Sequence, residues 1–149
     1  MPEAVPVDTD LVFAPLSPSA EQLAALDAID RAVLGLARRE EHVWLMSQLA
    51  GCLYLRNGRP VGYGYVGRRH GPFALLNAAD FPAVLAHAEA RAAGRLAEIG
   101  FEVPLINQAA VSYLLERGYR LGDFIVLAMT TEPLCRWEQY IATSPPLFV

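Results

Sequence analysis

The stretch Asn107-Gln-Ala-Ala-Val-Ser-Tyr-Leu-Leu-Glu-Arg-Gly-Tyr119 indicates more about the fold than any other part of the chain. Asn107 is a good helix cap, because its side chain can accept a hydrogen bond from an amide of the first turn. Ala110 allows close packing on a sheet, and Gly118 suits the left-handed position that ends a helix. The stretch therefore predicts a short helix over residues 107–117, with Tyr119 leading into the next strand.

Two strands are expected on either side of this helix. Ile99, Phe101 and Val103 alternate with polar or small residues, which is typical of a strand with one buried face. Pro104 limits that strand. After the helix, the apolar run at residues 124–129 predicts the last strand of the sheet.

Asn57-Gly58 gives a strong hairpin signal, because both residues tolerate the positive φ angles of a type I′ turn. The flanking runs, residues 52–56 and 61–66, are expected to be antiparallel strands. A further extended run at residues 72–76 follows. Residues 11–14 are interpreted as a short first strand that ends at Pro15.

Three more helices are expected. The first follows Ser17-Pro18-Ser19, with proline in the first turn and an apolar stripe at steps of three and four. Its acidic residues Asp27 and Asp30 are placed off the stripe. A second, short helix is expected at residues 43–49, after a solvated charged turn at 38–41. The third, at residues 81–93, has Asp80 before it and Gly94 near its end.

Composition indicates one domain, residues 1–149, with an extended arm or first strand at 1–16 and a tail at 130–149. Apolar residues make up 54% of the 149, and the net charge is −4. An acidic balance argues against nucleic-acid binding, and no apolar run approaches the ~20 residues that span a bilayer. Two cysteines, Cys52 and Cys135, are interpreted as free thiols. A cytoplasmic location is expected.

The spacing of Asn107, Ala110 and Gly118-Tyr119 resembles a segment near the end of GNAT-fold N-acetyltransferases. The turn Asn57-Gly58 followed by Gly62-Tyr63 is similar to a hairpin of that family. The helix at Asp30–Gly35, with Arg38 and Arg39, resembles the C-terminal, degenerate half of tandem GNAT proteins. The resemblance runs from about Leu16 to the C-terminus. It implies an α/β (α+β) fold, a mixed sheet of about six strands with helices on both faces.

The chain departs from this family where acyl-CoA should bind. The family holds the CoA pyrophosphate on a glycine-rich loop that opens a helix. Here the corresponding residues 75–82 contain no glycine or arginine, Asp80 is expected to cap the helix, and Pro82 removes an amide donor. The family's catalytic tyrosine position is Leu114, and Tyr113 lies about 100° away around the helix. Tyr113 is therefore interpreted as a packing residue.

We therefore expect a degenerate acetyltransferase-like domain with a structural, dimerising or substrate-shaping role. No catalytic residue, metal ligand or cofactor is expected. The first alternative is an active acetyl-CoA-dependent N-acetyltransferase acting on an unknown amine. It would hold acetyl-CoA through Asn107 and the strand residues Phe73, Ala74 and Leu75. The second alternative is a small-ligand binding module.

The expected partner is a second copy, in a homodimer that buries part of the region after residue 124, or a companion GNAT domain. Neither nucleic acid nor membrane is expected as a partner. Other residues that could act have simpler interpretations. Arg68-Arg69-His70 is interpreted as a solvated turn, with anion binding as the alternative. Glu98 and Glu102 are interpreted as surface charges, with a catalytic base as the alternative. His42 and His87 lack neighbours at metal-ligand spacing, and the Trp137/Tyr140/Ile141 face is expected to pack against the chain or a second copy.

Overall fold

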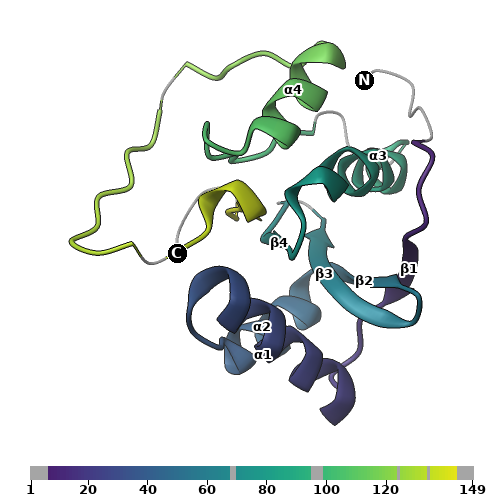
Figure 1. Ribbon diagram of the computed structural model, residues 1–149. Helices are drawn as coiled ribbons and strands as arrows, with labels where there is room; N and C mark the ends of the chain where they lie inside the picture. Colours follow the sequence, from purple (N-terminus) through teal and green to yellow (C-terminus); the bar gives the residue numbers. More distant parts are fainter. Residues whose placement is uncertain (1–6, 68–69, 95–98, 124, 134, 144–149) are drawn as a thin grey trace.

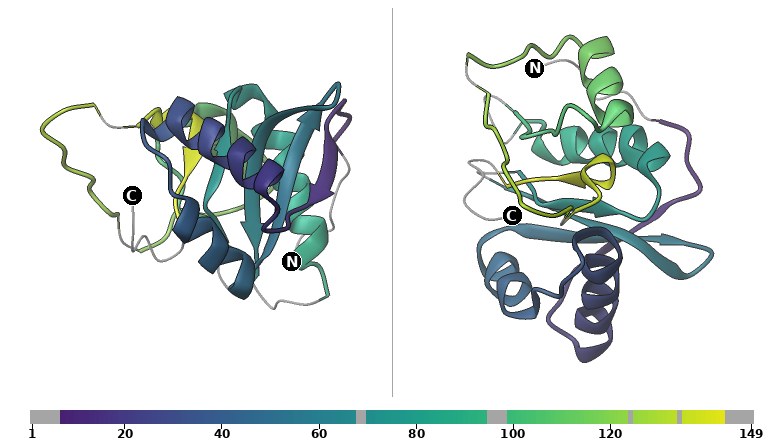
Figure 2. Two further views of the ribbon diagram at one scale, coloured as in Figure 1. Left: turned by 90° about the horizontal axis from the view of Figure 1, so that it is seen from below. Right: turned by 60° about the vertical axis from the view of Figure 1, so that its left-hand side comes forward.

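A computed structural model describes residues 7–67, 70–94, 99–123, 125–133 and 135–143. A single antiparallel sheet forms the middle layer, and two helices cover each of its faces (Figures 1 and 2). The protein is thus an α+β fold, and the expected helices on both faces of a sheet are confirmed.

The sheet has five strands in the order of the chain. They are β1 (Val12–Pro15), β2 (Ala50–Arg56), β3 (Arg59–Val66), β4 (Phe73–Leu75) and β5 (Tyr140–Ile141). Every strand pair is antiparallel. The expectation of a mixed sheet of about six strands is therefore not met in the described residues.

The β2–β3 hairpin is confirmed, and it forms for the reason that the sequence indicates. Asn57 and Gly58 both have positive φ, 51° and 75°. β1 pairs with β2 over four residues, from Val12 opposite Leu55 to Pro15 opposite Cys52. The first strand is thus one residue later than expected and includes the proline, which lies at the edge of the sheet.

Helices α1 (Ala20–Leu34) and α2 (Arg39–Gln48) cover one face. Ser19 caps α1 by accepting a hydrogen bond from the amide of Gln22, and Gly35 ends it at φ 81°. The sequence suggested that Pro18 lies in the first turn of this helix. In the structure it precedes the cap residue Ser19. α2 begins four residues earlier than expected and takes in most of the charged turn, residues 39–41.

Helices α3 (Phe81–Ala92) and α4 (Gln108–Glu116) cover the other face. Two short 3₁₀ turns, η1 (Ala78–Asp80) and η2 (Trp137–Gln139), precede α3 and β5. Asn107 caps α4 through the amide of Ala110, and Gly118 follows it at φ 85°. The predictions of both helices are confirmed.

The two strands expected on either side of α4 do not form as predicted. Of residues 99–103, only Glu102 makes a strand contact, a single antiparallel bridge to Ala142. Residues 125–129 have no regular secondary structure, and residue 124 lies outside the described residues. The reason is that the tail folds back and places β5 between β4 and Glu102. β5 runs antiparallel to both neighbours, so β4 and the Glu102 segment run in the same direction with one strand between them.

Two apolar cores lie on the two faces of the sheet. The core under α1 and α2 contains Leu26, Ile29 and Val33 of α1 together with Tyr63 and Tyr65 of β3. The core under α3 and α4 contains the opposite strand faces and the inner sides of these two helices. Its main members are Tyr54, Phe73, Leu75, Phe81, Val84, Leu85, Ala88, Ala110 and Leu114. No helix in the described residues is both long enough and apolar enough to cross a membrane.

Candidate functional site

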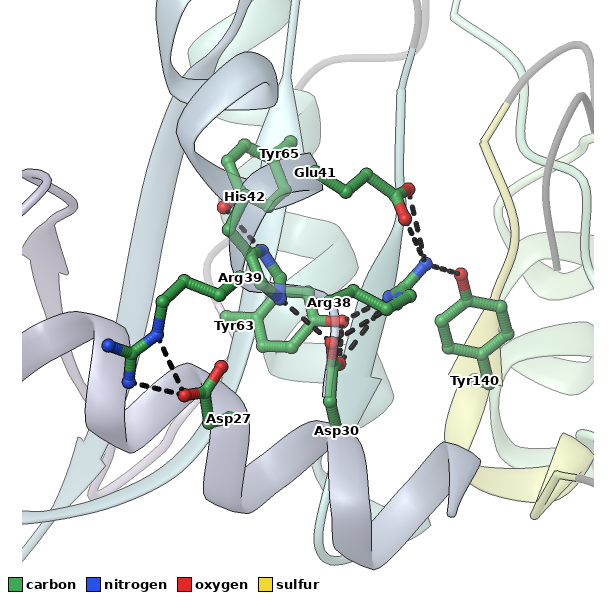
Figure 3. Close-up of polar contacts among 9 residues, drawn as sticks. All are labelled: Asp27, Asp30, Arg38, Arg39, Glu41, His42, Tyr63, Tyr65 and Tyr140. Atoms are coloured by element: carbon green, nitrogen blue, oxygen red, sulfur yellow. Dashed lines mark hydrogen bonds and ion pairs between the residues drawn. The ribbon is translucent and has the colours of Figure 1, made fainter. Parts of the chain in front are cut away.

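A network of polar side chains lies inside the first core, between α1, α2 and the sheet (Figure 3). Its centre is Asp30, which projects from the middle of α1 and has no exposed surface. Arg38 comes from the start of α2, Tyr63 from β3 and Tyr140 from β5. The network therefore joins two helices and two strands that are up to 110 residues apart in the chain.

The guanidinium of Arg38 is the cation of this network, and it is 8% exposed. Its Nε donates to Asp30 at 3.1 Å, and its terminal nitrogens donate to the hydroxyls of Tyr63 at 2.8 Å and Tyr140 at 3.3 Å. Glu41, one turn further along α2, accepts at 3.2 Å. Each partner is an oxygen, so the planar donor fork of arginine suits this site better than lysine would.

His42 connects Asp30 to a second tyrosine. Its Nε2 lies 2.9 Å from Asp30 Oδ2, and its Nδ1 lies 2.8 Å from the hydroxyl of Tyr65. His42 and Tyr65 are both fully buried. A tyrosine, a histidine and an aspartate in series can pass a proton in principle. All three side chains are buried. The series Tyr65–His42–Asp30 therefore orients side chains and does not present a reactive atom at the surface.

The electrostatics of the network favour the ion pair. Burial alone would raise the pKa of Asp30, but the hydrogen bond to His42 and the charge of Arg38 outweigh it, so this pKa is lowered. For Arg38 burial acts downward, and the surrounding tyrosines and Asp30 outweigh it, so its pKa is raised. Burial raises the pKa of Tyr140 to about 12. At neutral pH the network therefore holds a charged aspartate, a charged arginine and neutral tyrosines.

This network corrects two sequence-based expectations. Asp27 and Asp30 do not lie off the buried stripe of α1, since they are 5% and 0% exposed. The charged residues 38–41 do not form a solvated turn, because Arg38 reaches inward and Arg39 pairs with Asp27. One signal could have found part of this. Asp30 stands four residues after Leu26 and three before Val33, which places it on the apolar face of the helix.

The residues expected to hold acetyl-CoA under the active-enzyme alternative lie close together around β5. Phe73 and Ala74 pair with Ile141 and Tyr140 on one side of β4, and Leu75 is buried in the same strand. Asn107 is fully buried, and its Nδ2 donates to the carbonyl of Tyr140 at 3.3 Å. All four residues thus lie in β4 or contact β5. The sequence analysis had interpreted β5 as part of a packing tail.

A surface pocket of about 490 Å³ lies beside the start of α3. This is the region that corresponds to the glycine-rich loop of the acetyltransferases and that contains no glycine here. Arg56 of β2 enters it and bonds to the carboxylates of Asp80 and Asp10, each at 2.8 Å. Asp80 occupies the cap position of α3 but makes no side-chain capping bond. The expectation that it consumes the helix amides is therefore wrong, because its oxygens face Arg56. Asp8 also lines the pocket, so its lining contains three carboxylates and one guanidinium.

The remaining candidates are packing residues in the described structure. Tyr113 donates to Glu89 at 2.8 Å between α4 and α3, and Leu114 is buried. His70 is 4% exposed and packs near Phe101, so its part of the expected solvated turn is wrong. Arg68, Arg69 and Glu98 lie outside the described residues. Tyr140 and Ile141 are buried in the same chain, in line with the packing expected for that face.

Cys52 and Cys135 are free thiols, as expected. Among the described residues, no cluster of three or more histidine, cysteine, aspartate or glutamate side chains is placed to hold a metal ion. Comparison of this chain with protein-family models, with curated proteins and with solved structures found no match.

Proposed function

We propose that this chain is a GNAT-like domain that has lost acyl-CoA binding and has a structural role. The observation that carries the proposal is the position of β5. In the acetyltransferases that the sequence resembles, pantetheine contacts the backbone of the fourth strand. Here β4 pairs with β3 along one side and with β5 along the other. Its own chain thus takes up the backbone groups that pantetheine would need.

The side chain of Asn107 supports the same proposal. Its oxygen accepts from the amide of Ala110, and its nitrogen donates to Tyr140 in β5. Both ends of the amide are therefore used to hold the helix start and the inserted strand together. A ligand would have to displace β5 before it could reach this side chain.

The charge of the pocket at α3 also disfavours a pyrophosphate. Its lining contains three carboxylates and one guanidinium, and Arg56 is already held by Asp10 and Asp80. A diphosphate would have to break these charge-assisted hydrogen bonds, each worth about 1.5–3 kcal/mol. It would then meet a net negative site, which like-charge repulsion penalises.

Isothermal titration of acetyl-CoA into the full chain at pH 7.5 is the direct test of this proposal. We expect no measurable heat of binding at ligand concentrations up to about 1 mM, which corresponds to less than about 4 kcal/mol of binding free energy. Free pantetheine and inorganic pyrophosphate, titrated separately, report on the strand and the pocket. A micromolar dissociation constant for acetyl-CoA would favour the active-enzyme alternative. Heat from a ligand other than CoA would favour the small-ligand module.

A further inference from the structure

The apolar arm, which comprises the described residues 121–123 and 125–129, is the most exposed apolar part of the described chain. Its large apolar side chains are 54–83% exposed, and they are Leu121, Ile125, Val126, Leu127 and Met129. Figures 1 and 2 show the arm leaving the body of the protein between α4 and η2. A contiguous run of this kind is unusual on a monomer surface and indicates an interaction site.

The arm has the sequence of a strand. Ile125, Leu127 and Met129 share one face of an extended chain, while Val126 and Ala128 share the other. β-branched and long apolar residues at this spacing are typical of a strand that is buried on both faces. Of the residues between α4 and η2, those that the structure describes (117–123, 125–133, 135 and 136) form no helix or strand. Connections of this length are uncommon in a small domain and usually have a function.

The sheet ends in a complementary edge. The amide of Ala142 donates to the carbonyl of Glu102, so Glu102 faces β5. In strand geometry the backbone groups of its neighbours Phe101 and Val103 then point away from β5, toward the open edge. Among the described residues, neither Phe101 nor Val103 makes a backbone hydrogen bond. The opposite edge of the sheet, β1, includes Pro15, which cannot donate and is typical of an edge that avoids pairing.

The chain is fixed to the body at Tyr119, before the arm, and at Arg136, after it. Tyr119 packs on Phe101, with ring centroids 6.1 Å apart, and its amide donates to Leu114. At the other end, the amide of Arg136 donates to the carbonyl of Val33 at 2.8 Å. The arm thus starts beside the open edge and then projects away from it, which is the arrangement of an element that pairs with another molecule.

We propose that two copies of this chain exchange their apolar arms, each arm adding a strand to the Phe101–Val103 edge of the other copy. The exchange is reciprocal, so it forms a closed two-fold dimer and buries both arms. It rests on the structural role in the proposed function and makes that role specific, but its readout is molecular mass. It can therefore fail while acetyl-CoA binding stays absent, and the reverse also holds.

Light scattering over a range of protein concentrations tests the dimer. We expect a mass of about twice 16.3 kDa for the unmodified chain. The Leu127→Glu, Met129→Glu variant should give half that mass with an unchanged far-ultraviolet circular dichroism spectrum, because both side chains are exposed in the single copy. Trp44→Glu is the matched control, since Trp44 is 58% exposed on α2, and it should keep the dimer mass. A monomeric unmodified chain, or a dimer that only Trp44→Glu dissociates, would overturn the proposal.

Cross-linking distinguishes exchange from pairing within one chain. A cysteine at position 100 meets no atom within 4 Å of its Cβ, and position 127 is exposed, so both tolerate the change. In the Gly100→Cys, Leu127→Cys, Cys135→Ser variant, a short bis-maleimide should join two chains, as seen on a denaturing gel. The controls are Gly100→Cys and Leu127→Cys, each alone with Cys135→Ser, and they should give little covalent dimer. Cys52 remains in all three proteins and is buried. A link within one chain, or none, would contradict strand exchange.

Discussion

Arg38 is the residue through which the two helices of the first face are held to the sheet. Its guanidinium bonds to α1, β3 and β5 at once, with almost no exposure. Breaking a buried ion pair by removing one member leaves the other charge without compensation. The residue therefore matters less for the net energy of the pair than for what remains when it is lost.

Arg38→Ala is accordingly expected to destabilise the protein by about 3–5 kcal/mol, because Asp30 would stay buried without its cation. Urea denaturation followed by tyrosine and tryptophan fluorescence measures the change. Arg31→Ala is the control, since Arg31 follows Asp30 in α1 and is exposed, and it should change stability by less than about 0.5 kcal/mol. Equal effects of the two changes would show that the network is not a structural centre.

Whether the role of a single residue could be predicted from the sequence depended on how far away in the chain its partners lie. Asn57-Gly58 and the cap at Asn107 were predicted correctly because their chemistry acts on amides within three residues. The roles of Asp30, Arg38 and Asp80 were not predicted, because most of their partners lie between 8 and 102 residues away and are brought close only by the folded sheet. A charged residue on a helix is usually solvated, and only the apolar register of α1 argued otherwise.

At the scale of elements, the glycines of β3 decide how closely the strands and the second face pack. A Cβ at Gly64 would overlap the ring of Phe73 and the hydroxyl of Tyr54, both fully buried. Gly62 lies in the same strand and faces Leu75 and the β4 backbone in the same way. These glycines, which do not form a phosphate loop, leave room for large aromatic neighbours.

Gly64→Ala should therefore destabilise the protein by about 1–3 kcal/mol, the range found when extra carbon is forced into a packed core. Thermal denaturation followed by circular dichroism measures the loss. Gly100→Ala provides the comparison, because nothing lies within 4 Å of the added carbon and its midpoint should hardly move. A Gly64→Ala protein as stable as the unmodified chain would mean that Phe73 and Tyr54 can shift at little cost.

The four helices and the central hairpin could be predicted because each has local start and stop signals. The last strands could not, since strand pairing depends on which edge a segment meets. Residues 125–129 have the alternation of a strand and yet pair with nothing in the single copy, while Tyr140–Ile141 was interpreted as packing and forms β5. The alternating pattern identified a segment that can form a strand. Which segment entered the sheet depended on tertiary contacts.

On the scale of the whole molecule, the tail and the arm have complementary effects. β5 pairs with β4, and in the proposed function this pairing occupies the strand backbone that an acyl-CoA would use. The same insertion places the Glu102 segment at the edge of the sheet and leaves the arm outside it. If the proposed function is right, the missing cofactor site and the open pairing edge both follow from the position of β5.

This coupling leads to a prediction about stability and concentration. Association of folded copies, but not of unfolded chains, stabilises the folded state by mass action, so the melting temperature of an arm-exchanged dimer must rise with protein concentration. We expect the Tm of the full chain to rise steadily as the protein concentration is increased over about a hundredfold range. Differential scanning fluorimetry with intrinsic tryptophan signal measures this. The Leu127→Glu, Met129→Glu variant should melt at one temperature throughout that range, because its charged arm cannot be buried in a partner. An unmodified chain whose Tm ignored concentration in the same way would have no exchanged arms, and its apolar arm would then need a different occupant.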